Sequence, residues 1–477
     1  MNTHWKDILK KSLRESKHSR SDFYWFGSRM EDFLAYRSVI DFKSALSLNF
    51  SEEIINIHPE MKFLSFEALT QVRKDWNSIN MDSLFQSTLG MDAIRLLLNN
   101  SGEKNLLCYY PSQFMERLSY INSRLGRLNV LSNNFIIRHS LYDKFFVKRT
   151  VSSRGIQVVP FIIHSPHLLE FEDLRDLFPN ARRFVVQEAH GTSGIRTSLL
   201  RSKEDFRVFS CENRDSVITI SPFIKGTPVN VNACVYRGKT WAAFPSVQII
   251  GAPLCSDRVF GFCGSDFSHA KTFLQNNTLD DIFKMTIEIG EWLITLGYRG
   301  IFGLDFIVDE NGKPFFLEIN PRFQASTPYL IEEQMRQGFP PLICLHIAAF
   351  LNLEIGKLPS PFDYYSLPLQ GGYVIMHHNS SFEGRTISMP DSGLYEMNNG
   401  HISKTNEVKL SDDLKAKRLF AIHAGAPSKG TIVEKNAQLF KVSFSGEILG
   451  KNLSMKKHIS ETVETVRKSI DIKPFNE

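Results

Sequence analysis

The N-terminal part of the chain alternates short apolar runs with helical stretches. Within residues 21–140 the apolar runs fall at 23–26, 62–66, 106–110 and 128–131. Strands that alternate with helices usually build a parallel sheet, so we predict a small α/β sheet here. No glycine-rich fingerprint follows the first of these strands, which argues against a classical dinucleotide site.

An amphipathic helix is predicted ahead of this sheet, within residues 1–20. Its apolar positions are Trp5, Ile8, Leu9 and Leu13, and several lysines lie on its other faces. A basic amphipathic helix can lie on a membrane surface. We favour the alternative, in which the apolar stripe packs against the protein and the lysines face water.

The middle of the chain predicts paired strands and one long helix. Residues 184–200 and 216–236 are each typical of two strands around a turn of small or polar residues. Residues 279–296 repeat apolar side chains at intervals of three and four, which predicts a helix that ends at Gly297.

The last third of the chain has a different pattern. Three prolines between 359 and 368 mark a linker, and from residue 370 short strands are separated by Gly, Asn and Ser turns. We therefore predict three domains, at 1–139, 140–355 and 356–477, of which the first is α/β and the last is mostly β.

Composition narrows the class of protein. With 42% hydrophobic and 22% charged residues, the chain is typical of a soluble globular protein. Its 56 basic and 51 acidic residues are mixed along the chain, so no nucleic-acid partner is indicated. The six cysteines form no CxxC pair, which favours reduced thiols in a cytoplasmic protein. The most apolar stretch, 342–353, is too short to span a bilayer, so no membrane partner is predicted.

The most informative stretch is GIFGLDFIVDENGKPFFLEINPRFQ at 300–324. It predicts two strands joined by a two-residue turn at 311–312, because Asn-Gly is typical of tight hairpins. The register that follows from this turn makes two pairs, Ile307 with Phe316 and Asp305 with Glu318.

Two carboxylates thereby share one face of an otherwise apolar hairpin. Opposed side chains in a ladder lie about 5 Å apart, and like charges at that distance repel. The two-residue period of a strand adds the amide of Asn320 to the face of Glu318. A divalent cation would cancel the repulsion, and Mg²⁺ favours one or two carboxylates together with phosphate oxygens. The alternative is a solvated edge on which Asp305 and Glu318 never meet.

These residues carry a resemblance to a known family. Asp305, Glu318 and Asn320, followed by Pro321-Arg322, resemble the signature D…EINPR of the ATP-grasp superfamily. The resemblance implies that the first three hold Mg²⁺, with Mn²⁺ as a substitute, on the ATP phosphates. It also implies that Arg322 contacts phosphate or an acyl-phosphate intermediate. The expected fold is α/β, with two α+β subdomains that grip ATP over residues 140–355.

Two further stretches resemble the family in the expected order. Residues 140–160 are similar to the family's DK helix, which implies that Lys144 binds ATP phosphate; a helical lysine is otherwise usually a surface residue. Farther along comes a small-residue loop, for which the resemblance implies a mobile lid that closes over the phosphates. Its residues are Gly191, Thr192, Ser193 and Gly194. A plain hairpin loop has the same composition.

The position just before this loop departs from the family pattern. Many members have a lysine there, in the pattern V-x-K, where this chain has Gln187. Because Gln187 is a neutral hydrogen-bonding residue, the usual second phosphate-binding lysine is missing. Arg196 is one candidate for supplying that charge.

Residues 216–236 resemble the adenine hinge of the family. The resemblance implies adenine contacts from the hinge residues Ile220, Ser221, Phe223 and Ile224. The acids that are usual in the hinge are replaced by Ser221 and Asn230, which weakens the expected ribose contacts.

As a whole, the resemblance implies an ATP-dependent carboxylate–amine ligase. Members convert a carboxylate to an acyl phosphate with release of ADP, and an amine then displaces phosphate. Positioning and charge neutralisation by Mg²⁺, Lys144 and Arg322 suit this chemistry. The substrates expected are small-molecule carboxylates and amines, with amino acids, peptides and an acyl group on a carrier protein as options. The oligomeric state is left open, with a homodimer as one option.

Two alternatives stay open. A bicarbonate-using carboxylase of the biotin type has the pattern E-x-N-x-R-x-Q-x-E-H, whose last two positions are Ser326 and Thr327 here. A catalytically inactive nucleotide-binding module would fit Gln187 and the missing hinge acids. The intact set of carboxylates, Asn320 and Arg322 argues against such a module.

Overall fold

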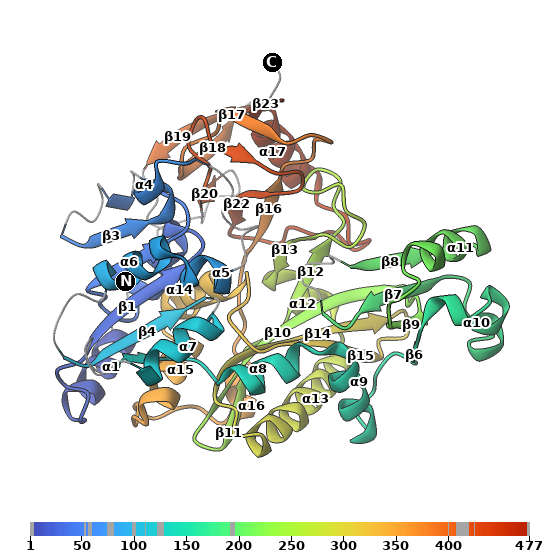
Figure 1. The fold of residues 1–477 in the computed structure, drawn as a ribbon, viewed down its shortest axis with the longest axis horizontal. Coiled ribbons are helices and arrows are strands. Elements are labelled where there is room, and N and C mark those ends of the chain that lie inside the picture. The colour runs from blue at the N-terminus through green and yellow to red at the C-terminus, as the bar shows by residue number, and fades with distance from the viewer. Residues whose placement is uncertain are drawn as a thin grey trace.

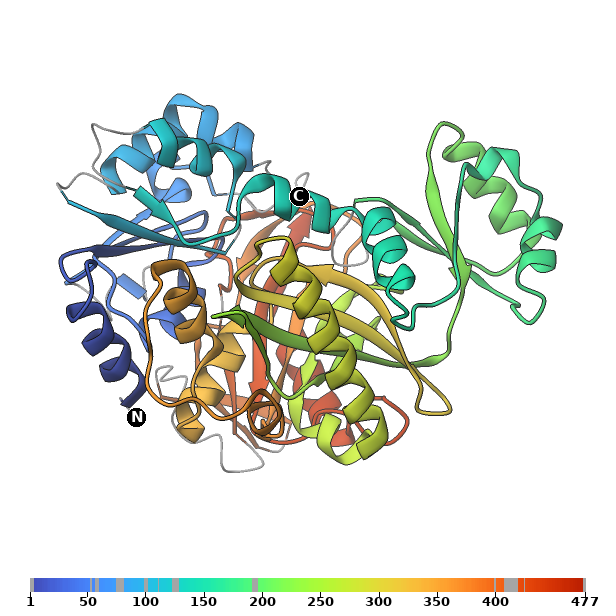
Figure 2. The same cartoon turned by 90° about the horizontal axis from the view of Figure 1, so that it is seen from below.

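The structure is a computed structural model, in which a large body carries a smaller projecting unit, coloured green in Figures 1 and 2. The ranges that it describes are 4–51, 54–55, 60–73, 81–97, 102–109, 111–121, 128–190, 196–398, 400–406, 419–423 and 425–474. Within these ranges no helix combines the length and the apolar character needed to cross a bilayer.

A parallel sheet forms the N-terminal part of the body, as the apolar runs predicted. In the described part of the chain its strands lie in the order β3 (Lys62–Ser65), β2 (Ser44–Ser47), β1 (Asp22–Gly27), β4 (Lys104–Cys108) and β5 (Leu128–Val130). All of these pairings are parallel. Strand β2 was not predicted. The helices of this region are α2 (Phe33–Arg37), α4 (Phe66–Thr70), α5 (Met81–Gln86), α6 (Thr88–Leu97) and α7 (Gln113–Ile121).

The first helix, α1 (His4–Arg14), packs against the body. Trp5, Leu9 and Leu13 are buried, and the indole N–H of Trp5 donates to the carbonyl of Gly338 at 2.9 Å. The lysines on its outer side include two that pair with Asp41. The packed interpretation of the amphipathic pattern is therefore confirmed.

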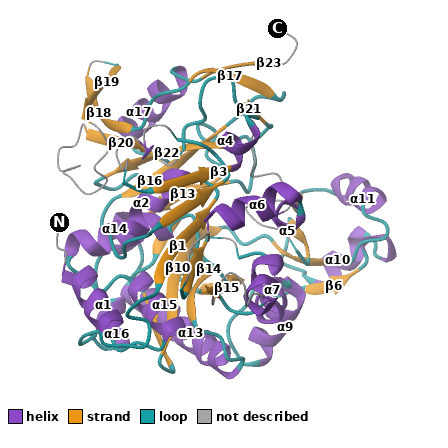
Figure 3. Cartoon of the chain, turned by 60° about the vertical axis from the view of Figure 1, so that its left-hand side comes forward, coloured by secondary structure: helices purple, strands orange, loops and turns teal. Residues whose placement is uncertain are grey.

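A long sheet of antiparallel pairs runs through the centre of the body (Figure 3). Among the described residues its order is β15 (Pro314–Asn320), β14 (Gly300–Asp309), β10 (Gly226–Tyr236), β12 (Ser246–Ile250), β13 (Phe262–Asp266), β16 (Gly372–His377), β22 (Gln438–Phe444), β20 (Leu419–His423), β18 (Gly393–Asn398) and β19 (His401–Asn406), with β11 (Lys239–Ala242) paired to β10. Strand β13 pairs with β16, so the C-terminal strands extend the sheet of the middle region. The predicted domain boundaries stay a prediction.

Helices and a small sheet complete the body. The long helix α13 (Asn276–Thr295) ends as predicted, with Gly297 in the left-handed region at φ +75°. It packs against β10, as does the buried helix α15 (Leu342–Leu351). The remaining elements are α12 (Phe267–Phe273), α14 (Thr327–Gln337), α16 (Pro361–Tyr365), α17 (Lys457–Lys468), β17 (Gly384–Ser388), β21 (Ile432–Val433) and β23 (Asp471–Pro474).

The projecting unit, which we call the small subdomain, comprises residues 162–222. Its strands lie in the order β6 (Ile162–His164), β9 (Ile218–Pro222), β7 (Phe184–Glu188) and β8 (Thr197–Leu200), with helices α10 (Phe171–Leu177) and α11 (Lys203–Glu212). It has a hydrophobic core of its own. Helices α8 (Phe135–Tyr142) and α9 (Lys144–Ser153) lead into it from the body (Figure 2).

The β14–β15 hairpin forms as predicted, but its turn does not. The N–H of Asp309 donates to the carbonyl of Lys313, so the loop has three residues, 310–312, and Gly312 takes φ +82°. A three-residue loop that ends in a left-handed glycine is a common hairpin connection. The predicted pairing of Ile307 with Phe316 is therefore wrong, because Ile307 faces Phe315.

Candidate active site

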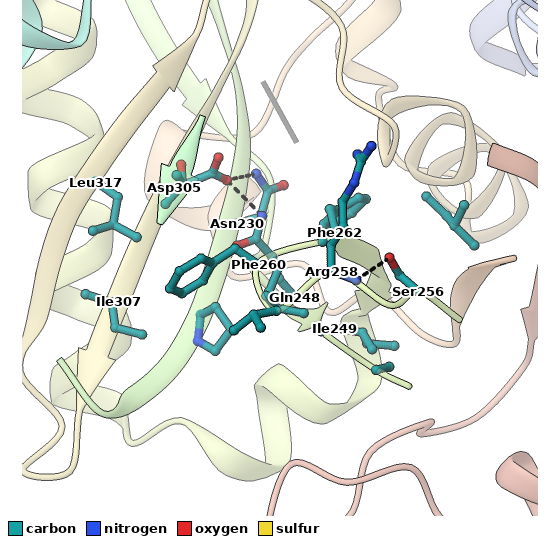
Figure 4. A pocket seen from close by; sticks show the side chains of 18 of the residues that line it. Asn230, Gln248, Ile249, Ser256, Arg258, Phe260, Phe262, Asp305, Ile307 and Leu317 are labelled. Atoms are coloured by element: carbon teal, nitrogen blue, oxygen red, sulfur yellow. Dashed lines mark hydrogen bonds between the residues drawn. The ribbon is translucent and has the colours of Figure 1, made fainter. Parts of the chain in front are cut away.

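A cavity of about 1230 Å³ opens between the small subdomain and the central sheet. Its wall on the small subdomain includes Arg183, Val185, Gln187, Thr197 and Ser221, and its wall on the sheet includes Asn230, Gln248, Asp305, Glu318 and Asn320. Residues of the N-terminal sheet and of the C-terminal strands close the far end, among them Ser28, Tyr109, Gln438 and Lys441. Three regions of the chain thus meet around one space, part of which Figure 4 shows.

Asp305 and Glu318 face each other at the edge of this cavity, as predicted. A β-bulge at Leu317 shifts the ladder by one residue between the turn and the pair. The three-residue turn shifts it by one residue in the opposite sense. The two shifts cancel, which is why the pairing of the acids was predicted correctly from a wrong turn.

Three amide groups converge on the carboxylate of Asp305. Asn320 donates to Oδ2 at 3.0 Å, as expected from its place on the same face. Asn230 of β10 and Gln248 of β12 donate to Oδ1 at 2.7 and 3.0 Å (Figure 4). These hydrogen bonds hold the buried carboxylate in one orientation, with Glu318 beside it.

Lys144 completes the cluster from the other side. The carboxylate of Asp143 caps α9 by accepting the N–H groups of Phe145 and Phe146, which makes Lys144 the first residue of the helix. Its Nζ atom lies 3.1 Å from Oε2 of Glu318. Lys144 is therefore a buried member of the site.

The two carboxyl groups differ in their protonation behaviour. Burial raises the pKa of Asp305, and the neighbouring charge of Glu318 raises it further, to about 7. Burial also acts to raise the pKa of Glu318, but the Lys144 ammonium outweighs it and the pKa is lowered. Near neutral pH Glu318 is therefore ionised while Asp305 is only partly ionised, and a bound cation would favour loss of the Asp305 proton.

The donor set fits a magnesium ion. Two carboxylates and the amide oxygen of Asn320 are hard oxygen ligands, and one or two carboxylates with phosphate oxygens is the usual protein environment of Mg²⁺. Within the described ranges no cluster of three or more His, Cys, Asp or Glu side chains offers another metal site. A bound cation would also oppose the repulsion between the two carboxylates, which together with burial raises the pKa of Asp305.

Arg322 lies beside this set, although the strand does not continue to it. Strand β15 ends at Asn320, and the N–H of Arg322 donates back to the carbonyl of Asn320 at 2.8 Å. Its Nη2 donates to Oδ1 of Asn320 at 3.3 Å, and the side chain lines the cavity. A cation is thus placed next to the predicted metal ligands.

Gln187 lies on β7 and faces the cavity. Its Oε1 accepts a hydrogen bond from Nζ of Lys148 at 3.0 Å. Arg196, the predicted source of the missing charge, is exposed and pairs with Glu188 at 2.8 Å. It is not among the residues that line the cavity.

The hinge between β9 and β10 lines the cavity with Ser221, Phe223 and Ile224, and their adenine contacts stay a prediction. The N–H of Phe223 already donates to the carbonyl of Arg183 at 2.9 Å. The side chain of Ile220 is buried in the core of the small subdomain. The predicted loop residues Gly191, Thr192, Ser193 and Gly194 lie outside the described residues.

Sequence reasoning missed Lys148, Gln248 and the role of Asn230. The signal for Lys148 was its spacing of four from Lys144, which places both on one side of a helix. Asn230 was read only as the replacement of a hinge acid, whereas it supports Asp305 from the neighbouring strand. No local sequence pattern indicates a role for Gln248, because it is the order of strands in the sheet that brings β12 to the site.

The fold and the cavity between the small subdomain and the central sheet can be compared with those of known proteins. Residues 142–326 match the family described as "ATP-grasp domain". Over this stretch, 185 of the 477 residues, the chain resembles ATP-grasp domains, and the relatives that it matches represent the carboxylate–amine ligase branch of that family.

Two curated relatives illustrate this branch. The D-alanine–D-alanine ligase of Pelotomaculum thermopropionicum is 25% identical over 212 residues, which cover 42% of this chain and 65% of that protein. The [butirosin acyl-carrier protein]–L-glutamate ligase of Niallia circulans is 20% identical over 239 residues, which cover 48% of this chain and 55% of that protein. Both matches leave at least a third of the relative uncovered.

The solved structures support the fold over most of the chain. The biotin carboxylase domain of Hydrogenobacter thermophilus 2-oxoglutarate carboxylase, in complex with MgADP and bicarbonate, aligns over 95% of this chain and 90% of its own, with a TM-score of 0.58. At 12% identity this likeness concerns the fold alone. The predicted ATP-grasp fold is confirmed.

Proposed function

We propose that this protein is an ADP-forming carboxylate–amine ligase that works through an acyl phosphate. The observation that carries this proposal is the cluster of Asp305, Glu318 and Asn320, with Lys144 and Arg322 beside it, in one cavity. With Mg²⁺ bound to the carboxylates, this set would neutralise phosphate charge from several sides. Within the cluster there is no need for a covalent nucleophile, since positioning and electrostatics are sufficient for phosphoryl transfer.

Each residue has a role in the proposed reaction. Bound Mg²⁺, held by the two carboxylates and Asn320, would neutralise the terminal phosphates of ATP. Lys144 approaches the phosphates from α9. A substrate carboxylate oxygen attacks the γ-phosphorus, and the bond between that phosphorus and ADP breaks. Arg322 then faces the acyl phosphate while the amine attacks the carbonyl carbon. The carbon–oxygen bond to phosphate breaks, and the amine loses a proton to solvent or phosphate.

The far end of the cavity offers room for the second substrate. Arg258, in the loop between β12 and β13, lines the cavity, and among the described residues no carboxylate forms an ion pair with its guanidinium. Apolar side chains such as Ile249, Phe260 and Phe262 lie around the same space (Figure 4). A cation next to apolar groups suits an amino acid, whose carboxylate and side chain need different surroundings.

The nature of the acyl donor is also a proposal. D-Alanine in one relative and an acyl-carrier protein with L-glutamate in the other support amino acids and carrier-bound acyl groups as candidates. We place free amino acids first, because the Arg258 side chain and apolar side chains line the same cavity. A homodimer and a cytoplasmic location stay predictions.

A biotin-type carboxylase is a weaker candidate. At the positions where that class has its Glu-His pair, this chain has Ser326 and Thr327, and both are buried. Asn232 donates to Oγ of Ser326 at 2.9 Å and accepts from Oγ1 of Thr327 at 3.0 Å. These hydroxyls serve a buried hydrogen-bond network and supply no base for bicarbonate.

The test is ADP release from Mg·ATP, screened against amino acids singly and in pairs. We expect ADP and phosphate in equal amounts, with release that depends on a specific pair, and an amide product detected by mass spectrometry. Bicarbonate-dependent release without an amine would favour the carboxylase. Nucleotide binding without release for any substrate would favour the inactive module.

A further inference from the structure

A second lysine of α9 points into the nucleotide cavity. Lys148 lies one helical turn after Lys144, is only 4% exposed, and lines the same space as Gln187 and Asp305. Its Nζ atom donates to Oε1 of Gln187 at 3.0 Å and lies 5.9 Å from the centre of the Phe161 ring. The ammonium thus bridges the start of the nucleotide domain and strand β7.

This buried cation has little negative charge to compensate it. In the described part of the chain no carboxylate lies within ion-pair distance of Lys148, and its neighbour Lys144 already pairs with Glu318. Burial lowers the pKa of Lys148 to about 8, with a further contribution from Lys144, while Glu318 acts in the opposite direction. A buried ammonium with a neutral partner is costly unless an anion joins it.

Lys148 lies where its ammonium could replace the phosphate-binding lysine that this chain lacks at position 187. The family pattern puts a phosphate-binding lysine at the position of Gln187, and Arg196 does not replace it because it pairs with Glu188 outside the cavity. We propose that Lys148 supplies this second phosphate contact from α9, and that Gln187 is the positioning residue that holds its ammonium toward the nucleotide. The inference rests on the proposed function only in taking ATP as the ligand.

A purely structural role for Lys148 makes a different prediction. If its hydrogen bond to Gln187 served only to hold the small subdomain against α9, loss of the ammonium would lower the stability of the protein. The affinity for phosphate would not change, because Lys144 alone would provide it. If Lys148 binds phosphate, its loss weakens nucleotide binding without lowering the stability of the nucleotide-free protein. A lysine at position 187 could then replace Lys148, because the family's phosphate-binding lysine lies at that position.

Calorimetry of Mg·ATP binding to the full chain separates these roles. We expect Lys148→Met to bind Mg·ATP at least about tenfold more weakly than wild type, as loss of a charged hydrogen bond predicts. Adding Gln187→Lys to that variant returns the ammonium from β7 and should recover most of the affinity. Arg149→Met, on the exposed side of the same helix, should bind as wild type does.

The outcomes distinguish this inference from the proposed function. Equal affinities for wild type and Lys148→Met, or no gain from the added Gln187→Lys, would overturn the role of Lys148. A melting temperature of nucleotide-free Lys148→Met well below that of wild type would show a structural role and overturn it too. If wild type itself binds no Mg·ATP, the proposed function fails before Lys148 is tested.

Discussion

The Nζ atom of Lys144 lies 3.1 Å from Oε2 of Glu318, so the first residue of α9 pairs with the second strand of the hairpin. This contact joins segments that are far apart in the sequence into one site. It also explains how Glu318 and Asp305 coexist, because the lysine stabilises the charge of Glu318 while burial and the charge of Glu318 raise the pKa of Asp305 to about 7. On binding, Mg²⁺ would displace the proton of Asp305, and phosphate would replace Glu318 as the partner of Lys144.

The metal site is tested by Glu318→Gln. This change keeps the shape of the side chain and removes its charge, so we expect Mg·ATP affinity to fall by at least about tenfold, in the range typical of disturbed metal sites. Calorimetry measures the loss. Glu310→Gln, in the exposed turn of the same hairpin where Glu310 pairs with Lys225, is the matched control. Wild-type affinity in Glu318→Gln would remove Glu318 from the site.

Arg322→Ala should separate binding from turnover. Because Arg322 lies beside Asn320 and faces the space for an acyl phosphate, we expect ATP affinity to stay nearly unchanged and kcat to fall at least about a hundredfold, on the order of 3 kcal/mol. Steady-state kinetics of ADP release, with calorimetry of Mg·ATP, gives both quantities. Arg237→Ala, at an exposed pair with Glu354, serves as the control. Full turnover in Arg322→Ala would contradict the assignment.

Arg258 is expected to set the affinity for the second substrate. It lines the cavity from the loop between β12 and β13 and is not one of the hairpin ligands, so Arg258→Ala should raise the KM of the amino-acid substrate roughly tenfold or more. The affinity for Mg·ATP should not change. An unchanged KM for each substrate would place the carboxylate elsewhere.

The stability of the nucleotide-free protein should depend on Lys148 and pH together. The pKa of this lysine is lowered from an ordinary value of 10.5 to about 8, so the unfolded chain binds more protons between these values and the contribution of Lys148 improves as pH rises. Lys148→Met should therefore be more stable than wild type at pH 7, by up to the order of 3 kcal/mol, and lose that advantage toward pH 10. The groups facing the ammonium are Lys144, Gln187, Glu318 and Phe161.

Urea unfolding at several pH values measures this difference, with Arg149→Met as the exposed control. A wild type that is more stable than Lys148→Met at pH 7 would mean that the ammonium is well compensated in the free protein. A difference that grows with pH would contradict the direction of the pKa shift.

The β14–β15 hairpin shows which features of the site could be predicted from the sequence. The facing of Asp305 and Glu318 followed from alternation, and it is correct because the longer turn and the bulge at Leu317 offset each other. Neither the turn length nor the bulge was predicted, since both depend on how β15 packs against its surroundings. Motif order drew attention to Lys144, which begins α9 after the cap at Asp143 and lies beside Glu318, and its phosphate contact stays a prediction.

Residues that join the site only through the tertiary structure could not be predicted from the sequence. Lys148 resembles a surface lysine in sequence, and its burial, in contact with Gln187 and Phe161, becomes visible only in the tertiary structure. Gln248 contacts Asp305 because β12 follows β10 in the sheet, an order that no local pattern encodes. The continuous sheet from β15 to β19 likewise joins regions that composition had separated at residue 355.

The most direct test of the proposed ligase is the fate of a carboxylate oxygen. With an amino-acid substrate labelled with ¹⁸O in its carboxylate, a second amino acid and Mg·ATP, attack on the γ-phosphorus makes the labelled oxygen the bridge of the acyl phosphate. Attack by the amine then leaves that oxygen on phosphate. We expect ADP, amide and phosphate that carries one ¹⁸O atom per turnover, measured by mass spectrometry. Unlabelled phosphate, or AMP as the nucleotide product, would contradict the acyl-phosphate mechanism.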